Sequence, residues 1–303
     1  MSKALSFFKG EIVPISDANV NIMTHALHYG TAVFEGVRGN WNESQSKMFV
    51  FRLKEHYERL LRGCSILLMD IPYDVKALCD ITINLINECG YQEDLYIRPI
   101  AYKSTEKVAD LRLHKLDSDF ALIIVPFGSY IEKEGAIRCC TASWRRMNDT
   151  NMPPRVKISG NYVNSILAKT EAVMAGFDEG IMLNQDGSVS EGTGENIYIV
   201  RNGEIKTTPV TSILEGITRD CVFKICADNN IRIKEQKFTR DELYIADEVF
   251  LSGTAAEITP VREVDDRGIG TGKPGKITQL IQKEYADIIK GINTKYKNWL
   301  TTV

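Results

Sequence analysis

The chain has 303 residues, which is enough for one large or two medium domains with a buried core. Its formal net charge is −3 at pH 7, so no excess of positive charge favours binding to nucleic acid or to an anionic membrane. No stretch approaches the ~18 consecutive apolar residues of a membrane span, and the start of the chain lacks the apolar run of a signal peptide. The seven cysteines are an odd number without a CxxC pair, which favours reduced thiols and predicts a cytoplasmic protein.

The first part of the chain is predicted to alternate strands and helices. Apolar periodicity and turn residues predict a hairpin at 6–16, a strand at 48–51, helices at 54–68 and 75–86, and strands at 95–102 and 120–127. Asp74 can cap the second of these helices, and Gly90 can end it. The glycine-rich segment 21–39 suggests backbone packed close to another group, and the charged stretch 103–119 is expected to be a functional or flexible loop.

The second part of the chain follows a predicted hinge at 128–135. Its elements are a strand at 137–144, a helix at 161–175, a strand at 180–183, a hairpin at 197–207, a helix at 216–228, strands at 231–235, 248–251 and 258–261, and a helix at 276–293. The two blocks predict a mixed α/β (α+β) fold. We expect two domains, residues 1–130 and 136–303, joined by a linker at 131–135.

Lys157 lies in the extended, proline-bearing segment 153–162, just before a capped helix start. A helix N-terminus favours anions, so a lysine in this place suggests a chemical role. The amine of a lysine can attack a carbonyl carbon and form a Schiff base. Most lysines are exposed surface residues, so this interpretation depends on the motifs that follow.

Three later motifs could hold a flat, anionic ligand. Segment 190–196 places Glu191 among glycines, where the backbone can approach a ring and the carboxylate can meet a protonated ring nitrogen, although a polar hairpin turn is the alternative. Residues 216–218 open a helix and could bind a phosphate monoester, although ordinary helix capping would look the same. The small-residue turn in 252–257 could present amides to a carboxylate.

Two further patterns favour other functions less well. Segment 270–277 has P-loop spacing, but Pro274 interrupts it and Ile277 replaces the Ser or Thr that binds magnesium. His25 and His28 have helical spacing, but the chain has only four histidines and no matching carboxylate helix, so structural roles are favoured and no metal is predicted. A nucleotide-binding or purely interacting protein, with a structural Lys157, is the distant alternative.

Six segments, in order over nearly the whole chain, resemble the branched-chain amino acid aminotransferases of the class IV family. They are 24–36, 96–99, 157–162, 190–196, 216–220 and 252–257. The resemblance implies a two-domain, fold-type IV pyridoxal 5'-phosphate enzyme with a small N-terminal α/β domain and a larger C-terminal pseudo-barrel α/β domain. It implies a homodimer or larger homo-oligomer that transfers the amino group of L-leucine, L-isoleucine or L-valine to 2-oxoglutarate in a reversible ping-pong reaction.

Residue by residue, the resemblance implies cofactor contacts. Lys157 would form the Schiff base and then shuttle the proton between the substrate Cα and the cofactor C4′. Glu191 would pair with the pyridine nitrogen, and Tyr162 would bind the phenolic oxygen. The remaining cofactor contacts would come from Arg59, Ile217, Thr218 and Thr254, with the first three at the phosphate.

The resemblance also implies a substrate site. Its walls and polar contacts would be Tyr29, Phe34, Gly36, Tyr96, Arg98, Tyr130, Thr254 and Ala255. Arg98 would meet the distal carboxylate of glutamate, and Thr254 with Ala255 would meet the α-carboxylate. Residues 127–130 depart from the tryptophan-bearing pattern of some members, and loop 103–119, which in the family helps to complete the neighbouring subunit's site, also differs. The same-fold alternatives are a D-amino acid aminotransferase and an aminodeoxychorismate lyase, which segments 25–30 and 96–99 argue against.

Overall fold

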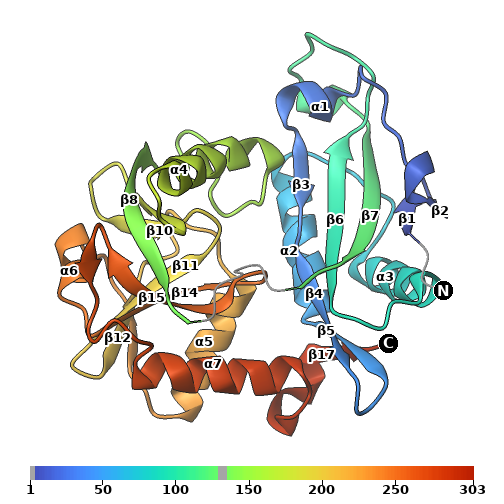
Figure 1. Ribbon diagram of the computed structural model, residues 1–303. Helices are drawn as coiled ribbons and strands as arrows, with labels where there is room; N and C mark the ends of the chain where they lie inside the picture. The colour runs from blue at the N-terminus through green and yellow to red at the C-terminus, as the bar shows by residue number, and fades with distance from the viewer. Residues whose placement is uncertain (1–3, 129–134) are drawn as a thin grey trace. The chain divides into compact units, whose positions relative to one another are not determined.

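The structure is a computed structural model that describes residues 4–128 and 135–303. Its chain forms two compact units, both interrupted in sequence (Figure 1). Unit 1 comprises Met1–Gly128, Val156–Gly160 and Ile288–Val303, and unit 2 comprises Ser129–Arg155 and Asn161–Asp287. Tyr130 and most of the predicted linker lie outside the described residues, so the predicted domain boundaries stay a prediction. The predicted boundaries placed Lys157 in the second domain, whereas the structure assigns Val156–Gly160 to unit 1.

Unit 1 is built on an antiparallel sheet. In its described residues, eight strands pair in the order β17-β5-β4-β6-β7-β1-β2, with β3 beside β6. The strands are β1 (Leu5–Phe8), β2 (Glu11–Pro14), β3 (Ala32–Phe34), β4 (Val37–Asn42), β5 (Lys47–Phe51), β6 (Leu95–Lys103), β7 (Ser118–Pro126) and β17 (Leu300–Thr302). The helices are α1 (His25–Tyr29), α2 (Leu53–Ile66) and α3 (Val75–Cys89). Helices α2 and α3 pack on each other, and α3 contacts β1 and β7.

Strand β6 shows how the sequence orients this sheet. Leu95 and Ile97 are fully buried, whereas Tyr96 and Arg98 between them are half-buried. Because successive side chains of a strand point to opposite faces, Tyr96 and Arg98 share the face opposite to the apolar core residues. The strand therefore presents a hydroxyl and a guanidinium side by side.

Unit 2 is built on a mixed sheet. Nine strands of its described residues pair in the order β10-β9-β8-β15-β14-β11-β12-β13, with β16 beside β15. Strand β8 runs parallel to β9 and β15, and β12 runs parallel to β13. The strands are β8 (Ile137–Arg145), β9 (Glu179–Leu183), β10 (Val189–Gly192), β11 (Asn196–Arg201), β12 (Glu204–Thr207), β13 (Ile233–Glu235), β14 (Glu248–Gly253), β15 (Glu257–Val264) and β16 (Arg267–Gly268). The predicted mixed α/β fold class is thus confirmed.

Helices flank the strands of unit 2 (Figure 1). They are α4 (Tyr162–Met174), α5 (Ile217–Asp228), α6 (Arg240–Tyr244) and α7 (Lys276–Ile289), the last of which ends in unit 1. Helix α4 packs on β8 and β9, and α5 contacts β14. Short 3-10 turns occur at Ile15–Asp17, Leu113–Lys115, Ser159–Asn161 and Thr294–Trp299. Over residues 4–128 and 135–303, no helix combines the length and apolarity needed to cross a membrane.

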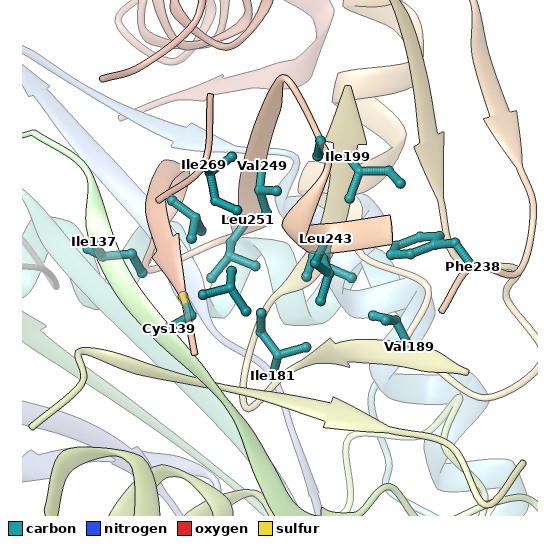
Figure 2. Close-up of a cluster of buried hydrophobic side chains, with 14 of the residues drawn as sticks. Ile137, Cys139, Ile181, Val189, Ile199, Phe238, Leu243, Val249, Leu251 and Ile269 are labelled. Carbon is teal, nitrogen blue, oxygen red and sulfur yellow. The ribbon is translucent and has the colours of Figure 1, made fainter. Parts of the chain in front are cut away.

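The core of unit 2 gathers aliphatic side chains from several strands around Leu243 (Figure 2). Leu243 is fully buried, and Phe238 packs in the same cluster. Leu243 belongs to α6, whose five residues are otherwise mostly polar. A helix this short carries too little apolar periodicity to be recognised in the sequence, which explains why α6 was not predicted.

Segment Val156–Gly160 is held in unit 1 by main-chain contacts with the β3 region. The amide of Phe34 donates to the carbonyl of Lys157 at 3.0 Å, and the amide of Gly160 donates to the carbonyl of Gly30 at 3.1 Å. Val33 and Ile158 form an isolated antiparallel β-bridge. Gly30 has a φ of +64°, and a Cβ there would lie 2.7 Å from the Cα of Gly160. Only glycine at position 30 therefore lets the segment approach this closely.

Gly30→Ala should destabilise the protein by more than Gly90→Ala, measured as the free energy of unfolding in urea. Both glycines have similar positive φ values, +64° and +67°, but a Cβ at Gly90 meets nothing within 4 Å. Gly90→Ala should cost about 1–2 kcal/mol for the left-handed backbone alone. The clash at Gly30 should add about 1–3 kcal/mol. Equal losses in the two variants would show that the contact with Gly160 is not tight.

Candidate functional site

Lys157 lies beside an aromatic ring in unit 1. It is half-buried between Val156 and Ile158, which are buried on the opposite side of the extended segment. Its Nζ is 5.0 Å from the centroid of the Phe34 ring. The structure thus brings together the predicted nucleophile and a predicted wall of the substrate site.

Arg98 extends this cluster. Its guanidinium carbon lies 4.5 Å from the Phe34 ring centroid and 5.0 Å from that of Tyr96, and its Nη2 donates to the Tyr96 hydroxyl at 2.8 Å. The Nε of Arg98 is buried and has no hydrogen-bond partner among the described residues. A Cβ at Gly36 would lie 2.2 Å from the Tyr96 hydroxyl, so glycine there leaves room for that group. The Phe34 ring is therefore contacted both by Lys157 and by the guanidinium of Arg98.

Tyr29, another predicted wall residue, contacts a different segment. Its hydroxyl accepts a hydrogen bond from the amide of Ala109 at 2.9 Å, and its ring lies 4.5 Å from that of His25. His25 in turn bonds the carbonyl of Asp110 through Nε2 at 2.8 Å. These contacts fasten loop 103–119 to α1, so the described loop is held in place by specific bonds.

The guanidinium of Arg59, the predicted phosphate-binding residue, forms an ion pair with the buried carboxylate of Glu35. Its Nε and Nη2 donate to the two oxygens of Glu35 at 2.6 and 2.7 Å, and His56 Nδ1 lies 2.9 Å from the same carboxylate. Burial raises the pKa of Glu35, but the charge of Arg59 and the hydrogen bonds from Arg59 and His56 outweigh it and hold that pKa well below its ordinary value. Glu35 therefore fixes the direction of the Arg59 guanidinium.

Glu191, the predicted partner of a ring nitrogen, lies on β10 in unit 2 and is 3% exposed. Its Oε1 forms an ion pair with Nη2 of Arg146 at 2.7 Å, and its Oε2 accepts from Nδ2 of Asn196 at 3.1 Å. Arg146 also donates to the hydroxyl of Ser165 at 2.8 Å. Both carboxylate oxygens are thus oriented by neighbouring side chains. Strand β10 ends at Gly192, whose amide donates to the carbonyl of Glu195 at 2.7 Å, so the alternative hairpin turn of this motif is also present.

The predicted phosphate-binding helix start and the predicted carboxylate-binding turn lie close to this acid in the fold of unit 2. Gly216 precedes α5, whose first residues Ile217 and Thr218 are buried. The first amides of a helix have no intrahelical acceptor and favour an anion. Strand β11 pairs Asn196 with Ser252 of β14, so the turn bearing the half-buried Thr254 and Ala255 follows directly.

Tyr162, the predicted partner of the phenolic oxygen, is the first residue of α4. Its side chain is half-buried. The 3-10 turn Ser159–Asn161 separates it from Lys157, which belongs to unit 1. The helix start predicted between Lys157 and Tyr162 is therefore present.

A family model described as amino-transferase class IV matches residues 32–264. The chain belongs to the class IV aminotransferases. The family predicted from the six segments is thereby confirmed.

Known relatives of this aminotransferase match over their full length. A probable branched-chain-amino-acid aminotransferase of Aquifex aeolicus is 45% identical, covering 100% of this chain and 97% of the relative. A branched-chain aminotransferase of Thermoproteus uzoniensis, solved with norvaline, has a TM-score of 0.95 and 44% identity, covering 100% of this chain and 99% of that one. The branched-chain amino acid aminotransferase of Thermobaculum terrenum, solved in its PLP-form, has a TM-score of 0.94 and 36% identity, covering 99% of this chain and 98% of that one. The predicted enzyme class agrees with all three.

Four residues of the aminotransferase that contact the predicted site residues Arg59 and Glu191 were not predicted from sequence: Glu35 and His56 in unit 1, Arg146 and Asn196 in unit 2. Asn196 stands in the motif that carries Glu191, and a polar residue opening an apolar strand was the available signal. For Glu35 the available signal was its position among closely spaced glycines. Arg146 follows β8 without any pattern, because its partner is 45 positions away.

The pattern that resembled a P-loop has another use. The N-terminus of α7 is capped by Glu248, whose carboxylate accepts from the amides of Ile277 and Thr278 at 3.1 and 2.8 Å. A Cβ at Gly275 would overlap the same carboxylate. The helix end that a nucleotide phosphate would need is therefore filled by the protein's own acid. The described residues also contain no group of three His, Cys, Asp or Glu side chains able to hold a metal ion.

A second buried acid lies next to the Glu191 motif. Glu195 is 5% exposed and accepts from the amide of Gly194 at 3.1 Å, whereas nearby Glu179 is paired with Lys169 at 2.5 Å. Burial, followed by the charge of Glu179, raises the pKa of Glu195 from 4.5 to about 8. Glu195 is thus a protonated acid at neutral pH.

Glu195→Gln should flatten the pH dependence of stability. The unfolded chain releases this proton above pH 4.5, but the folded protein keeps it up to about pH 8. The free energy of unfolding of the wild type should therefore fall with rising pH in that window, by up to about 1.4 kcal/mol per pH unit. The variant, measured by urea denaturation between pH 5 and 8, should lose that slope, and exposed Glu88→Gln should keep it. A slope unchanged in Glu195→Gln would contradict the protonated state.

Proposed function

We propose that this class IV aminotransferase uses pyridoxal 5'-phosphate to move the amino group of L-leucine, L-isoleucine or L-valine to 2-oxoglutarate. The products are branched-chain 2-oxo acids and L-glutamate, and the reaction is reversible and ping-pong. The observation that carries the proposal is the cluster of Lys157, Phe34 and Arg98, which combines a nucleophile, an apolar wall and a buried guanidinium Nε without a partner among the described residues. The names of the relatives support the same substrates.

The residues present fit this cofactor. The start of α5, with the amides of Ile217 and Thr218, and the guanidinium of Arg59 are the groups that bind a phosphate monoester. Glu191, which forms an ion pair with Arg146, would hold a protonated ring nitrogen. Tyr162 and Thr254 would complete the contacts. When bound, pyridoxal phosphate supplies a ring that accepts electrons from the α-carbon of the amino acid.

Lys157 would have two tasks. Its Nζ would hold the cofactor covalently between turnovers, and the same amine would take the proton from the α-carbon of the amino acid and return it later. The Phe34 ring, 5.0 Å from the Nζ, covers part of this half-buried amine. One side chain can thus serve first as base and then as acid.

The residues around Phe34 suggest which part of each substrate they would contact. Its ring, with Tyr96, Gly36 and Tyr29, would contact the branched apolar side chain. Arg98 would pair with the distal carboxylate of glutamate or 2-oxoglutarate, which would satisfy its Nε. The amides of Thr254 and Ala255 would hold the α-carboxylate. Tyr130, also proposed for this site, lies outside the described residues.

We also propose a homodimer in the cytoplasm. Ile22 on the segment before α1 and Leu111 on loop 103–119 are 73% and 77% exposed, which supports coverage by a second copy of the chain. All seven cysteines, which lie in the described residues, have free thiols, as expected in a reducing compartment.

A substrate panel tests this function. With pyridoxal phosphate and 2-oxoglutarate, the purified protein should form glutamate from L-leucine, L-isoleucine and L-valine. D-alanine should give no glutamate, and aminodeoxychorismate should not be cleaved. Turnover of either of these in preference to the three L-amino acids would favour the corresponding same-fold enzyme.

Lys157→Ala should abolish covalent attachment of the cofactor. Borohydride treatment of the wild type should fix the cofactor on Lys157, as seen by mass spectrometry of peptides, and should remove the yellow colour. The variant should stay unlabelled and lose turnover by about 10³-fold or more. The exposed Lys76→Ala should behave as wild type. A label on another lysine would exclude Lys157 as the nucleophile.

Arg98→Met should weaken binding of 2-oxoglutarate much more than it affects the reaction with L-leucine. A charge-assisted hydrogen bond contributes about 1.5–3 kcal/mol, so the variant should bind 2-oxoglutarate about 10–100-fold more weakly. The half-reaction with L-leucine, followed by absorbance of the cofactor, should change much less because it needs no distal carboxylate. Arg62→Met, at an exposed arginine of helix α2 in the same unit, is the control. Equal losses for both substrates would exclude a carboxylate-binding role for Arg98.

A further inference from the structure

Asn196 connects two groups of unit 2 that have separate tasks in the proposed function. It is 4% exposed, and its Nδ2 carries two hydrogens. The Nδ2 lies 3.1 Å from Oε2 of Glu191 and 3.0 Å from the carbonyl oxygen of Leu214, and it donates to both. One amide group thus joins the acid on β10 to the segment that leads into α5.

The position of this amide is itself fixed from two sides. Asn196 is the first residue of β11, and its main chain pairs with Ser252 of β14. A Cβ at Gly216 would lie 2.2 Å from the Oδ1 of Asn196, so the turn before α5 packs directly against the side chain. The amide therefore has little freedom to rotate or to shift.

Glu191 is held equally firmly on its other oxygen. Arg146 pairs with Oε1 at 2.7 Å and is anchored to Ser165 at 2.8 Å. Because Arg146 neutralises the carboxylate and fixes one oxygen, Asn196 determines where the second oxygen lies relative to the start of α5. Asn196 therefore fixes the distance between the Glu191 carboxylate and the N-terminus of α5.

We propose that Asn196 is the positioning residue that sets the spacing between Glu191 and the N-terminus of α5, and so matches them to the ring nitrogen and the phosphate of one cofactor molecule. This inference rests on the proposed function, in which those two groups hold the two ends of pyridoxal phosphate. Asn196 itself touches neither end. It acts through Glu191 and Leu214.

The test compares two probes that have the pyridine ring but no aldehyde, so that Lys157 cannot bind them covalently: pyridoxine 5'-phosphate and pyridoxine. The dissociation constant of pyridoxine divided by that of pyridoxine 5'-phosphate measures what the phosphate adds to binding. In Asn196→Ala the ring and phosphate contacts should no longer form together. The ratio should fall about tenfold, which corresponds to about one net hydrogen bond, because binding of pyridoxine 5'-phosphate weakens while that of pyridoxine changes little.

Two further variants make the test decisive. Gly216→Ala keeps Asn196 but displaces its amide, so it should lower the same ratio, and it carries the test if Asn196→Ala does not fold. Asn184→Ala is the matched control, since its Nδ2 also donates to two acceptors, Ser188 Oγ and the carbonyl of Val189. Its ratio should equal that of the wild type.

The outcomes separate this inference from the proposed function. If the wild type binds pyridoxal phosphate and the ratio falls in both site variants, the positioning role is supported. If the two dissociation constants rise by the same factor in both variants, Asn196 has only a structural role and the inference is wrong. If the wild type binds neither pyridoxal phosphate nor pyridoxine 5'-phosphate, the proposed function itself fails.

Discussion

The short segment Val156–Gly160 is the constraint on which the site depends. Two main-chain hydrogen bonds and a glycine-to-glycine contact fix it to the β3 region of unit 1, although the chain on either side belongs to unit 2. Main-chain bonds determine the direction of an extended segment, so alternation then decides which side chains turn inward. Val156 and Ile158 are buried, and Lys157 between them faces Phe34. The amine of Lys157 is therefore placed by the geometry of the backbone that carries it.

The buried carboxylates of Glu35 in unit 1 and Glu191 in unit 2 have a common arrangement, in which each has a cation and a hydrogen-bond donor. Glu35 has Arg59 and His56, and Glu191 has Arg146 and Asn196. Removing an ion from water costs free energy that such pairing largely offsets. Glu195 is the exception, since burial leaves it protonated. Pairs of this kind hold side chains in one orientation, which a site for a rigid planar cofactor requires.

The sequence predicted much of the fold because most elements are long enough to show their own signals. Helix α3 begins at Asp74, whose Oδ1 accepts from the amide of Ala77 at 2.8 Å, and it ends at Gly90 with φ +67°, as the pattern indicated. Some elements of three to six residues, among them β3, β10 and α6, were missed because a few residues cannot establish a period. The family and the enzyme class were predictable from six motifs in order. Arg146 was not, because an ion pair between positions 45 residues apart leaves no local pattern, whereas Asn196 lies within the motif of Glu191 and its hydrogen bonds appear only in the fold.

The order in which the two units are completed follows from their interruption in sequence. Unit 2 ends at Asp287, whereas unit 1 also needs strand β17 and the preceding 3-10 turn, which follow unit 2 in sequence. Domains that form during synthesis fold as their residues emerge from the ribosome. Unit 1 starts first but cannot complete its sheet until all of unit 2 has been made. A nonsense mutation just after Asp287 would therefore spare the later unit and damage the earlier one.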